Sequence, residues 1–205
     1  RRIHAGSSDN VRVSVVGNSY GDPSGLGWQS CRFPARDIAL MQKPAPNEHG
    51  DMTALPEQLL ESVFGFPAFR PGQKEIVDRL LEGTHTLSVM PTGAGKSICY
   101  QLPALIAEQL TVVVSPLVAL MDDQVAGLRA NGVAAVCIHS NRSREDNVAD
   151  WRRVQDGSIK LLYLSPERLM TERMLTALQG LDPAMFVVDE AHCISKWGFS
   201  FRPEY

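Results

Sequence analysis

Short apolar runs alternate along this chain with longer stretches in which apolar residues recur every three or four positions. The short runs, rich in β-branched residues, lie at residues 86–90, 111–115, 133–138, 160–164 and 185–188, and the longer patterns lie at residues 97–108, 117–131, 142–155 and 172–178. The short runs predict strands and the longer patterns predict helices. Such alternation is typical of an α/β fold in which a mostly parallel sheet carries helices on both faces. Pro103 falls inside the first helical pattern, so we expect a break or kink near it.

The first predicted strand leads into the sequence Pro-Thr-Gly-Ala-Gly-Lys-Ser at residues 91–97. Two glycines allow a tight turn that aims backbone N–H groups inward, Lys96 brings a positive charge to the outer phosphates, and Ser97 offers a hydroxyl to Mg²⁺ as a helix begins. Met90 stands where the strict pattern has glycine, and the alternative is a glycine-rich turn that caps a helix. The sequence favours a phosphate-binding loop, with nucleotide contacts from Thr92, Gly93, Ala94, Gly95, Lys96 and Ser97.

Two carboxylates follow the last predicted strand, which ends at residue 188. Ligands of parallel sheets bind at the carboxyl ends of the strands, so Asp189 and Glu190 are expected at the same edge as the phosphate loop. Asp189 would hold Mg²⁺ through water, and Glu190 would orient or deprotonate the attacking water. The alternative is a solvated strand end. We therefore predict ATP and Mg²⁺ as cofactors, with Lys96, Asp189 and Glu190 as catalytic residues and Ser97 and Asp189 as the metal-binding residues.

Six motifs in order resemble the first RecA-like lobe of a RecQ-family DNA helicase of superfamily 2, over residues 55–205. Besides residues 91–97 they are Phe-Arg-Pro-Gly-Gln at 69–73, Ser-Pro-Leu at 115–117, Leu-Ser-Pro-Glu-Arg-Leu at 164–169, Asp-Glu-Ala-His at 189–192 and an aromatic-rich segment at 193–205. The resemblance implies a RecA-like P-loop NTPase lobe from a helicase that moves 3′ to 5′ on DNA in recombination and repair.

The resemblance also implies roles for residues outside the phosphate loop. Gln73 would read the adenine edge, Arg70 would contact the base or its surroundings, and Phe66 would pack on the ring. Backbone contacts to single-stranded or branched DNA would come from the segments that contain Ser115, Pro116 and Arg168.

The aromatic-rich segment carries Trp197, Phe199 and Phe201, with Arg202 beside them. Aromatic faces can stack on bases and the arginine can meet a phosphate, so we predict a further DNA contact here. The alternative is that these rings fill the core. The family usually has a His-Asp pair where this chain has Phe199 and Ser200, and coupling of this segment to the catalytic centre is expected to be weaker or altered.

Composition narrows the setting without identifying a partner. The formal net charge of −3 means that any DNA contact must come from a local patch. No window has the apolar length of a membrane span, and no signal-peptide pattern opens the chain. The four cysteines, Cys31, Cys99, Cys137 and Cys193, lack metal-ligand spacing, so we interpret them as reduced thiols. We expect a cytoplasmic protein, associated with the nucleoid if it is bacterial.

Residues 1–51 fall outside the α/β pattern. They show no sustained periodicity apart from a brief alternation at residues 11–16, and they are predicted to be a linker or disordered. Met52 opens the first helical segment, so one hypothesis is that translation starts there; the alternative is a genuine N-terminal extension. Residues 52–205 would then be an incomplete first lobe.

A second lobe, with the arginine that completes catalysis, is expected in cis beyond residue 205. The fragment would bind ATP with Mg²⁺ without unwinding DNA, and whether it binds single-stranded DNA by itself is left open. Two other classes also remain open: a lobe of another superfamily 2 enzyme, such as an RNA helicase, and a non-catalytic nucleotide-binding module.

Overall fold

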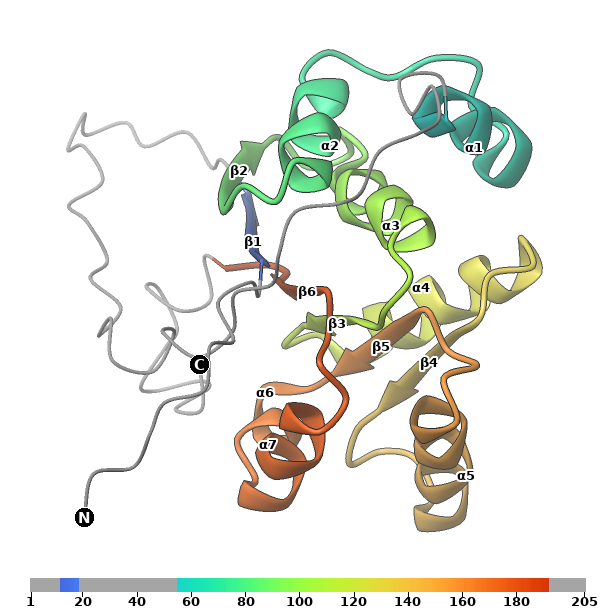
Figure 1. Ribbon diagram of the computed structural model, residues 1–205, viewed down its shortest axis with the longest axis vertical. Helices are drawn as coiled ribbons and strands as arrows, with labels where there is room; N and C mark the ends of the chain where they lie inside the picture. The colour runs from blue at the N-terminus through green and yellow to red at the C-terminus, as the bar shows by residue number, and fades with distance from the viewer. Residues whose placement is uncertain (1–11, 19–54, 192–205) are drawn as a thin grey trace, which may run out of the picture.

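The chain folds around one parallel β-sheet. The computed structural model describes residues 12–18 and 55–191 (Figure 1). Six strands lie in the order β2-β1-β6-β3-β5-β4, and every neighbouring pair is parallel. Their bounds are β1 (Arg12–Asn18), β2 (Thr86–Met90), β3 (Thr111–Val114), β4 (Ala135–Ile138), β5 (Leu161–Leu164) and β6 (Met185–Val188). All carboxyl ends therefore meet at one edge of the sheet.

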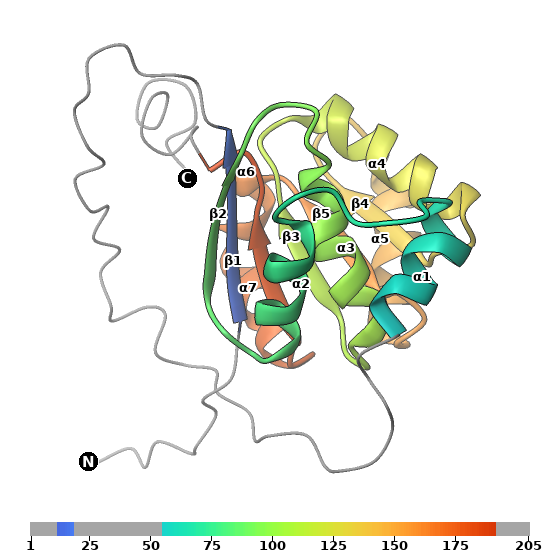
Figure 2. The same cartoon turned by 90° about the horizontal axis from the view of Figure 1, so that it is seen from above.

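Helices cover both faces of this sheet (Figure 2). They are α1 (Leu55–Phe64), α2 (Gln73–Leu81), α3 (Lys96–Ile106), α4 (Val118–Ala130), α5 (Arg144–Gln155), α6 (Pro166–Leu169) and α7 (Glu172–Gln179). Residues of α2, α3 and α4 pack with Val113, Tyr163 and Val187 in one core cluster. Residues of α5 and α7 pack with Val112 and Leu162 in another. Successive side chains of a strand point to opposite faces, so β3, β4, β5 and β6 each contribute residues to both clusters.

The fold class predicted from the sequence is confirmed, with adjustments in detail. The strand expected at residues 133–138 begins at Ala135, and the short helix α6 was not predicted. Pro103 lies inside α3 without breaking it, and the helix continues to Ile106. The carbonyl of Pro103 accepts a 2.9 Å hydrogen bond from the Ala107 N–H, which closes the last turn. The expected break therefore appears only as an early helix end, one turn after the proline.

Strand β1 lies inside the segment for which the sequence predicted a linker or disorder. It is inserted between β2 and β6, with Val15 in register with Leu87 on one side and Val188 on the other. Only the brief alternation at residues 11–16 indicated it, because the place of the strand is set by pairing with β2 and β6. The division of the chain at residue 52 stays a prediction. No helix in the described ranges is long and apolar enough to cross a membrane.

Candidate active site

The predicted phosphate loop connects the end of β2 to the start of α3. Gly93 and Gly95 both have φ near +79°, a conformation that side chains with Cβ rarely adopt. A Cβ on Gly95 would lie 2.5 Å from Nε2 of Gln73, so a side chain at this position would also displace the Gln73 amide. The Ala94 N–H donates to the Pro91 carbonyl at 3.2 Å and tightens the turn. The sequence therefore forms the turn that the motif predicted.

The first turn of α3 meets this loop without a capping side chain. Gly95 is the N-cap residue and makes no side-chain capping bond. Lys96 and Ser97 follow in the first turn, where a helix presents backbone N–H groups and the positive end of its dipole. This is the environment that an anionic phosphate requires, so the residues present fit ATP.

Gln73 and Arg70 hold the loop from outside. The buried Gln73 amide donates to the carbonyls of Ala94 at 3.2 Å and Gly95 at 3.0 Å, and it accepts from the Arg70 N–H at 2.8 Å. The Arg70 guanidinium donates to the carbonyl of Gly93 at 2.6 Å. The carbonyls of Gly93, Ala94 and Gly95 are thus each held by a donor from Arg70 or Gln73. In this state both donors of Gln73 serve the loop, so reading adenine would require the amide to change partners.

The two carboxylates lie at the carboxyl end of β6. The Asp189 N–H donates to the carbonyl of Val114 at 2.8 Å, which fixes the residue beside β3. Asp189 is 5% exposed, and its Oδ1 accepts the Glu190 N–H at 2.9 Å. Glu190 has φ of 52°, an uncommon left-handed conformation for a residue with a side chain. Strain of this kind is frequent at functional sites, which is consistent with the predicted role of Glu190.

Burial, followed by the charge of Glu190, raises the pKa of Asp189 from 3.8 to about 6. The Glu190 N–H and the positive charge of Lys96 act in the opposite direction. Lys96 is therefore close enough to Asp189 to influence its ionisation, although the two residues are far apart in sequence. A buried carboxylate with a raised pKa at a sheet edge also fits a divalent cation, which would relieve the repulsion.

Two tyrosines near this carboxylate were not predicted. Tyr100 and Tyr163 are fully buried, and burial together with the charge of Asp189 raises the pKa of each hydroxyl. Gln101 donates to the Tyr163 hydroxyl at 3.0 Å. These hydroxyls stay protonated, but an apolar helix pattern gives no signal that separates such a tyrosine from ordinary core.

The other residues predicted to contact nucleotide or DNA differ in their exposure to solvent. Phe66 is 44% exposed, whereas Ser115 and Pro116 are buried. Their proposed contact with DNA stays a prediction. The aromatic residues and arginine predicted to contact DNA lie outside the described residues; they are Trp197, Phe199, Phe201 and Arg202.

Arg168, another predicted DNA contact, lines a hollow of about 790 Å³. Three further arginines, Arg142, Arg144 and Arg173, also line it, and sequence reasoning missed them. Among the described residues that line it, Glu167 is the only acidic one. Nε of Arg168 is buried and has no hydrogen-bond partner within the described part of the chain. The hollow is therefore a local basic patch on a chain of net negative charge.

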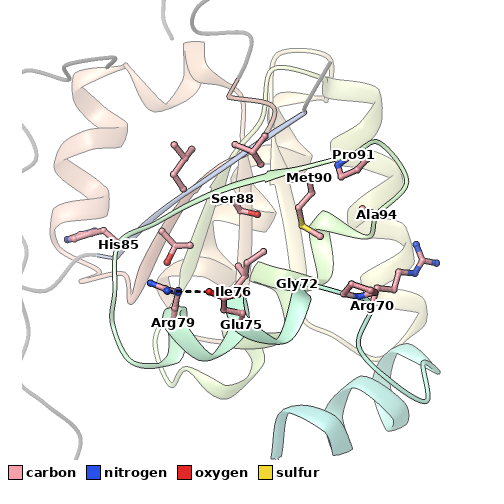
Figure 3. Close-up of a pocket in the computed structure, with 14 residues that line it drawn as sticks. Arg70, Gly72, Glu75, Ile76, Arg79, His85, Ser88, Met90, Pro91 and Ala94 are labelled. Atoms are coloured by element: carbon pink, nitrogen blue, oxygen red, sulfur yellow. Dashed lines mark hydrogen bonds and ion pairs between the residues drawn. The ribbon is translucent and has the colours of Figure 1, made fainter. Parts of the chain in front are cut away.

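A second hollow, of about 660 Å³, runs between α2 and β2 (Figure 3). Its lining includes Arg70, Pro91 and Ala94 at the phosphate-loop end, and Glu75 and Arg79 farther along α2. Arg79 and Glu75 pair at 3.2 Å across one turn of α2. The hollow thus adjoins the phosphate-loop end of β2.

Known proteins match most of the chain. A family model described as DEAD/DEAH box helicase matches residues 70–205. The "ATP-dependent DNA helicase RecQ" of Haemophilus influenzae is 46% identical over 147 residues, which cover 72% of this chain and 24% of that protein. The protein of the same name from Bacillus subtilis is 45% identical over 150 residues, covering 73% and 25%. Human "ATP-dependent DNA helicase Q4" is 41% identical over 179 residues, covering 84% and 15%.

The chain therefore spans about a quarter of the length of its bacterial relatives. The region of similarity begins near the first motif recognised in the sequence and includes the phosphate loop and both carboxylates. The resemblance to RecQ helicases is confirmed, and the chain belongs to the DEAD/DEAH box helicase family.

Proposed function

We propose that this chain is the ATP-binding lobe of a 3′ to 5′ DNA helicase that acts in recombination or repair. The observation that carries the proposal is the meeting of the phosphate loop and the two carboxylates at one sheet edge, where the charge of Lys96 acts on the pKa of Asp189. The names of the relatives supply the DNA substrate and the dependence on ATP. Its place of action would be the cytoplasm, at the nucleoid in a bacterium.

Each residue of the site has a distinct task in this proposal. The N–H groups of the loop and α3 bind the phosphates, while Lys96 compensates the charge of the outer ones. Ser97 and Asp189 would hold Mg²⁺, which when bound neutralises charge on the phosphates. Glu190 orients the attacking water and accepts its proton. Gln73 and Arg70 keep the loop in the conformation that receives phosphate.

A binding measurement on residues 1–205 tests the nucleotide site. Lys96→Ala is expected to weaken Mg-ATP binding in calorimetry at least tenfold, because it removes the cation at the outer phosphates. Lys74→Ala is the matched control, since Lys74 pairs with Glu57 and Asp78 on the surface. Equal affinities of wild type and Lys96→Ala would refute the site.

The basic hollow supports a role for Arg168 in holding the DNA backbone. Arg168→Ala is expected to weaken binding of labelled single-stranded DNA in fluorescence anisotropy and to reduce the salt dependence of that binding. Arg152→Ala, on the exposed side of α5, serves as the control. Equal DNA affinity of the two variants would remove Arg168 from the proposal.

Hydrolysis and unwinding require more than this chain in the proposal. We expect residues 1–205 to show no strand separation, because the arginine that stabilises the transition state would come from a second lobe. DNA-stimulated ATP hydrolysis by a longer form would separate a DNA helicase from a non-catalytic nucleotide-binding module. A comparison of DNA with RNA as the stimulating strand would separate it from an RNA helicase.

A further inference from the structure

Three potential metal ligands from two elements converge at the β4 edge of the sheet. Cys137 lies in β4, His139 directly follows β4, and Asp122 lies in α4. One ligand atom from each lies within 4.8 Å of the other two. Strands β4 and β2 are the two outer strands of the sheet, so the cluster lies at the other side of the sheet from the phosphate loop that follows β2. The proposed function does not use these three side chains.

The convergence follows from strand geometry and helix packing. Residues 137 and 139 are two positions apart, so they point to the same face of the sheet. Helix α4 covers that face, since Met121 and Val125 share a core cluster with Cys137. Asp122 comes next to Met121 on the helix and reaches the cluster from the solvent side. Its side chain is 51% exposed while that of His139 is 1% exposed, so the cluster opens to solvent through Asp122.

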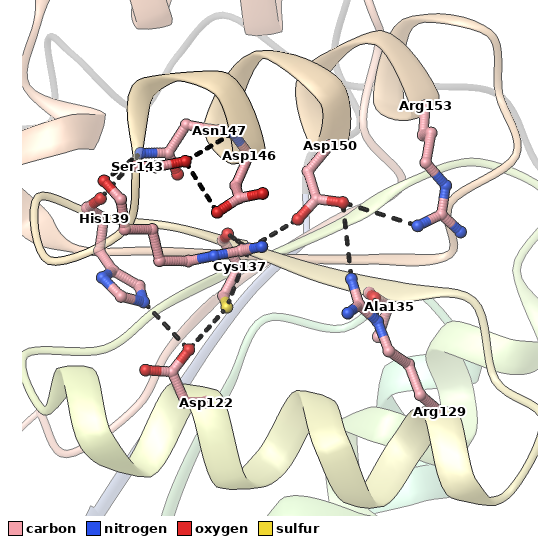
Figure 4. Close-up of polar contacts among 11 residues, drawn as sticks. Asp122, Arg129, Ala135, Cys137, His139, Ser143, Asp146, Asn147, Asp150 and Arg153 are labelled. Atoms are coloured by element: carbon pink, nitrogen blue, oxygen red, sulfur yellow. Dashed lines mark hydrogen bonds and ion pairs between the residues drawn. The ribbon is translucent and has the colours of Figure 1, made fainter.

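Two of the three interatomic distances are close to those of a tetrahedral ligand set. Oδ1 of Asp122 lies 3.2 Å from Sγ of Cys137 and 3.1 Å from Nε2 of His139 (Figure 4). Zinc bonds of about 2.0–2.3 Å at tetrahedral angles place such ligand atoms about 3.3–3.6 Å apart. A shift of a few tenths of an ångström would bring these two pairs to coordination distances, and the third pair, Sγ of Cys137 and Nε2 of His139, lies within 4.8 Å.

We propose that Asp122, Cys137 and His139 bind one Zn²⁺ ion, with the fourth position open to solvent. A thiolate and a carboxylate supply two negative charges, which balance the divalent cation, and the imidazole is a neutral ligand. The thiol proton leaves to solvent as the metal binds. The site does not depend on the ATP-binding function.

The neighbouring charges are compatible with a cation. The Arg142 guanidinium lies 3.5 Å from Sγ of Cys137, where it can donate a hydrogen bond to the ligating sulfur. Its positive charge is already paired with the buried Asp150 at 2.6 Å. Metal ligation through Nε2 puts the ring proton of His139 on Nδ1. That atom is buried and has no hydrogen-bond partner in the described part of the chain, so the only bond of the ring that the metal replaces there is the one between Nε2 and Asp122.

Cobalt titration of metal-free residues 1–205, without nucleotide, tests the proposal. One Co²⁺ per chain should bind and give the near-ultraviolet band of cobalt–thiolate ligation, and Zn²⁺ should displace it. Magnesium sites of the phosphate loop cannot give this band because they contain no sulfur. Asp122→Asn should weaken cobalt binding at least about tenfold, and Cys137→Ser should abolish the band.

Matched variants keep the test decisive. Asp123→Asn changes an exposed neighbour on α4, and Cys99→Ser changes a buried cysteine that contacts Sδ of Met90 instead; both should retain the band. Circular dichroism checks that each variant folds, and Asp122→Asn alters an exposed side chain if Cys137→Ser does not fold. A missing band in the folded wild type, or a band that survives both Asp122→Asn and Cys137→Ser, overturns the proposal.

Discussion

Replacing Asp189 by asparagine should make the nucleotide-free protein more stable while it damages the site. Burial and Glu190 raise the pKa of Asp189 from 3.8 to about 6, so the ionised form is disfavoured in the folded state. Each pKa unit corresponds to about 1.4 kcal/mol, which sets an upper limit of about 3 kcal/mol on the cost of ionisation at neutral pH. Asparagine removes the charge and keeps an Oδ1 that can accept the Glu190 N–H. Allowing for the burial of its amide, we expect a gain of about 1–3 kcal/mol.

The pH dependence gives the sign of this effect. A carboxyl group whose pKa is higher in the folded state binds its proton more readily there, so wild-type stability falls as pH rises from about 4 to about 6. The advantage of Asp189→Asn should be complete at pH 8 and nearly absent at pH 4. Urea titrations at both pH values, in EDTA and without nucleotide, measure it. The exposed Asp123→Asn is the control.

Two results would refute the reasoning about Asp189. One is an Asp189→Asn variant that is no more stable than wild type at pH 8. The other is an advantage of equal size at pH 4 and pH 8, which would exclude ionisation as its cause. Mg-ATP affinity should fall in the same variant, because the carboxylate proposed to hold the metal is gone.

Three further predictions test the loop and the sheet. Gln73→Ala should lower affinity for both ATP and GTP by about 5- to 30-fold, because the hydrogen bonds of Gln73 position the loop. Unchanged affinities in calorimetry would exclude this role. A loss confined to ATP would show that Gln73 reads the base instead. Gly95→Ala should lower the free energy of unfolding measured in urea by about 1–2 kcal/mol or more, because Gly95 has a positive φ. Gly127→Ala lies inside α4 with nothing within 4 Å of the added Cβ, so it should raise the free energy of unfolding by about 0.5–1 kcal/mol. Val15→Pro should cost about 3 kcal/mol if β1 pairs on both sides, and Val15→Thr should be mild; equal melting temperatures for these two variants would remove β1 from the sheet.

The elements predicted best were those with a strong local signal. The strand at 111–114 is buried along its whole length, and its continuous apolar residues predict it directly. The turn at 93–95 needs positive φ angles, which its two glycines readily adopt. Strand β1 could not be predicted with its place, since its position between β2 and β6 depends on partners far along the chain.

The site was predicted as a set of residues more completely than as a set of contacts. Motif spacing predicted Lys96, Asp189 and Glu190 as site residues, which stays a prediction, yet it could not show that Gln73 holds carbonyls of the loop. Likewise, no spacing rule joins Asp122 to Cys137 and His139, because a helix and a strand edge bring them together only in the folded chain.

The position of β1 between β2 and β6 has a consequence for folding. This strand is the first of the six in the sequence, and one of its two partners, β6, is the last. Strand β2, which carries the phosphate loop, touches the rest of the sheet only through β1. During synthesis, β6 can therefore pair with β1 only after nearly the whole described chain has been made. A contact of such high sequence separation slows folding, and it leaves the edges of β1 and β2 exposed until β6 pairs.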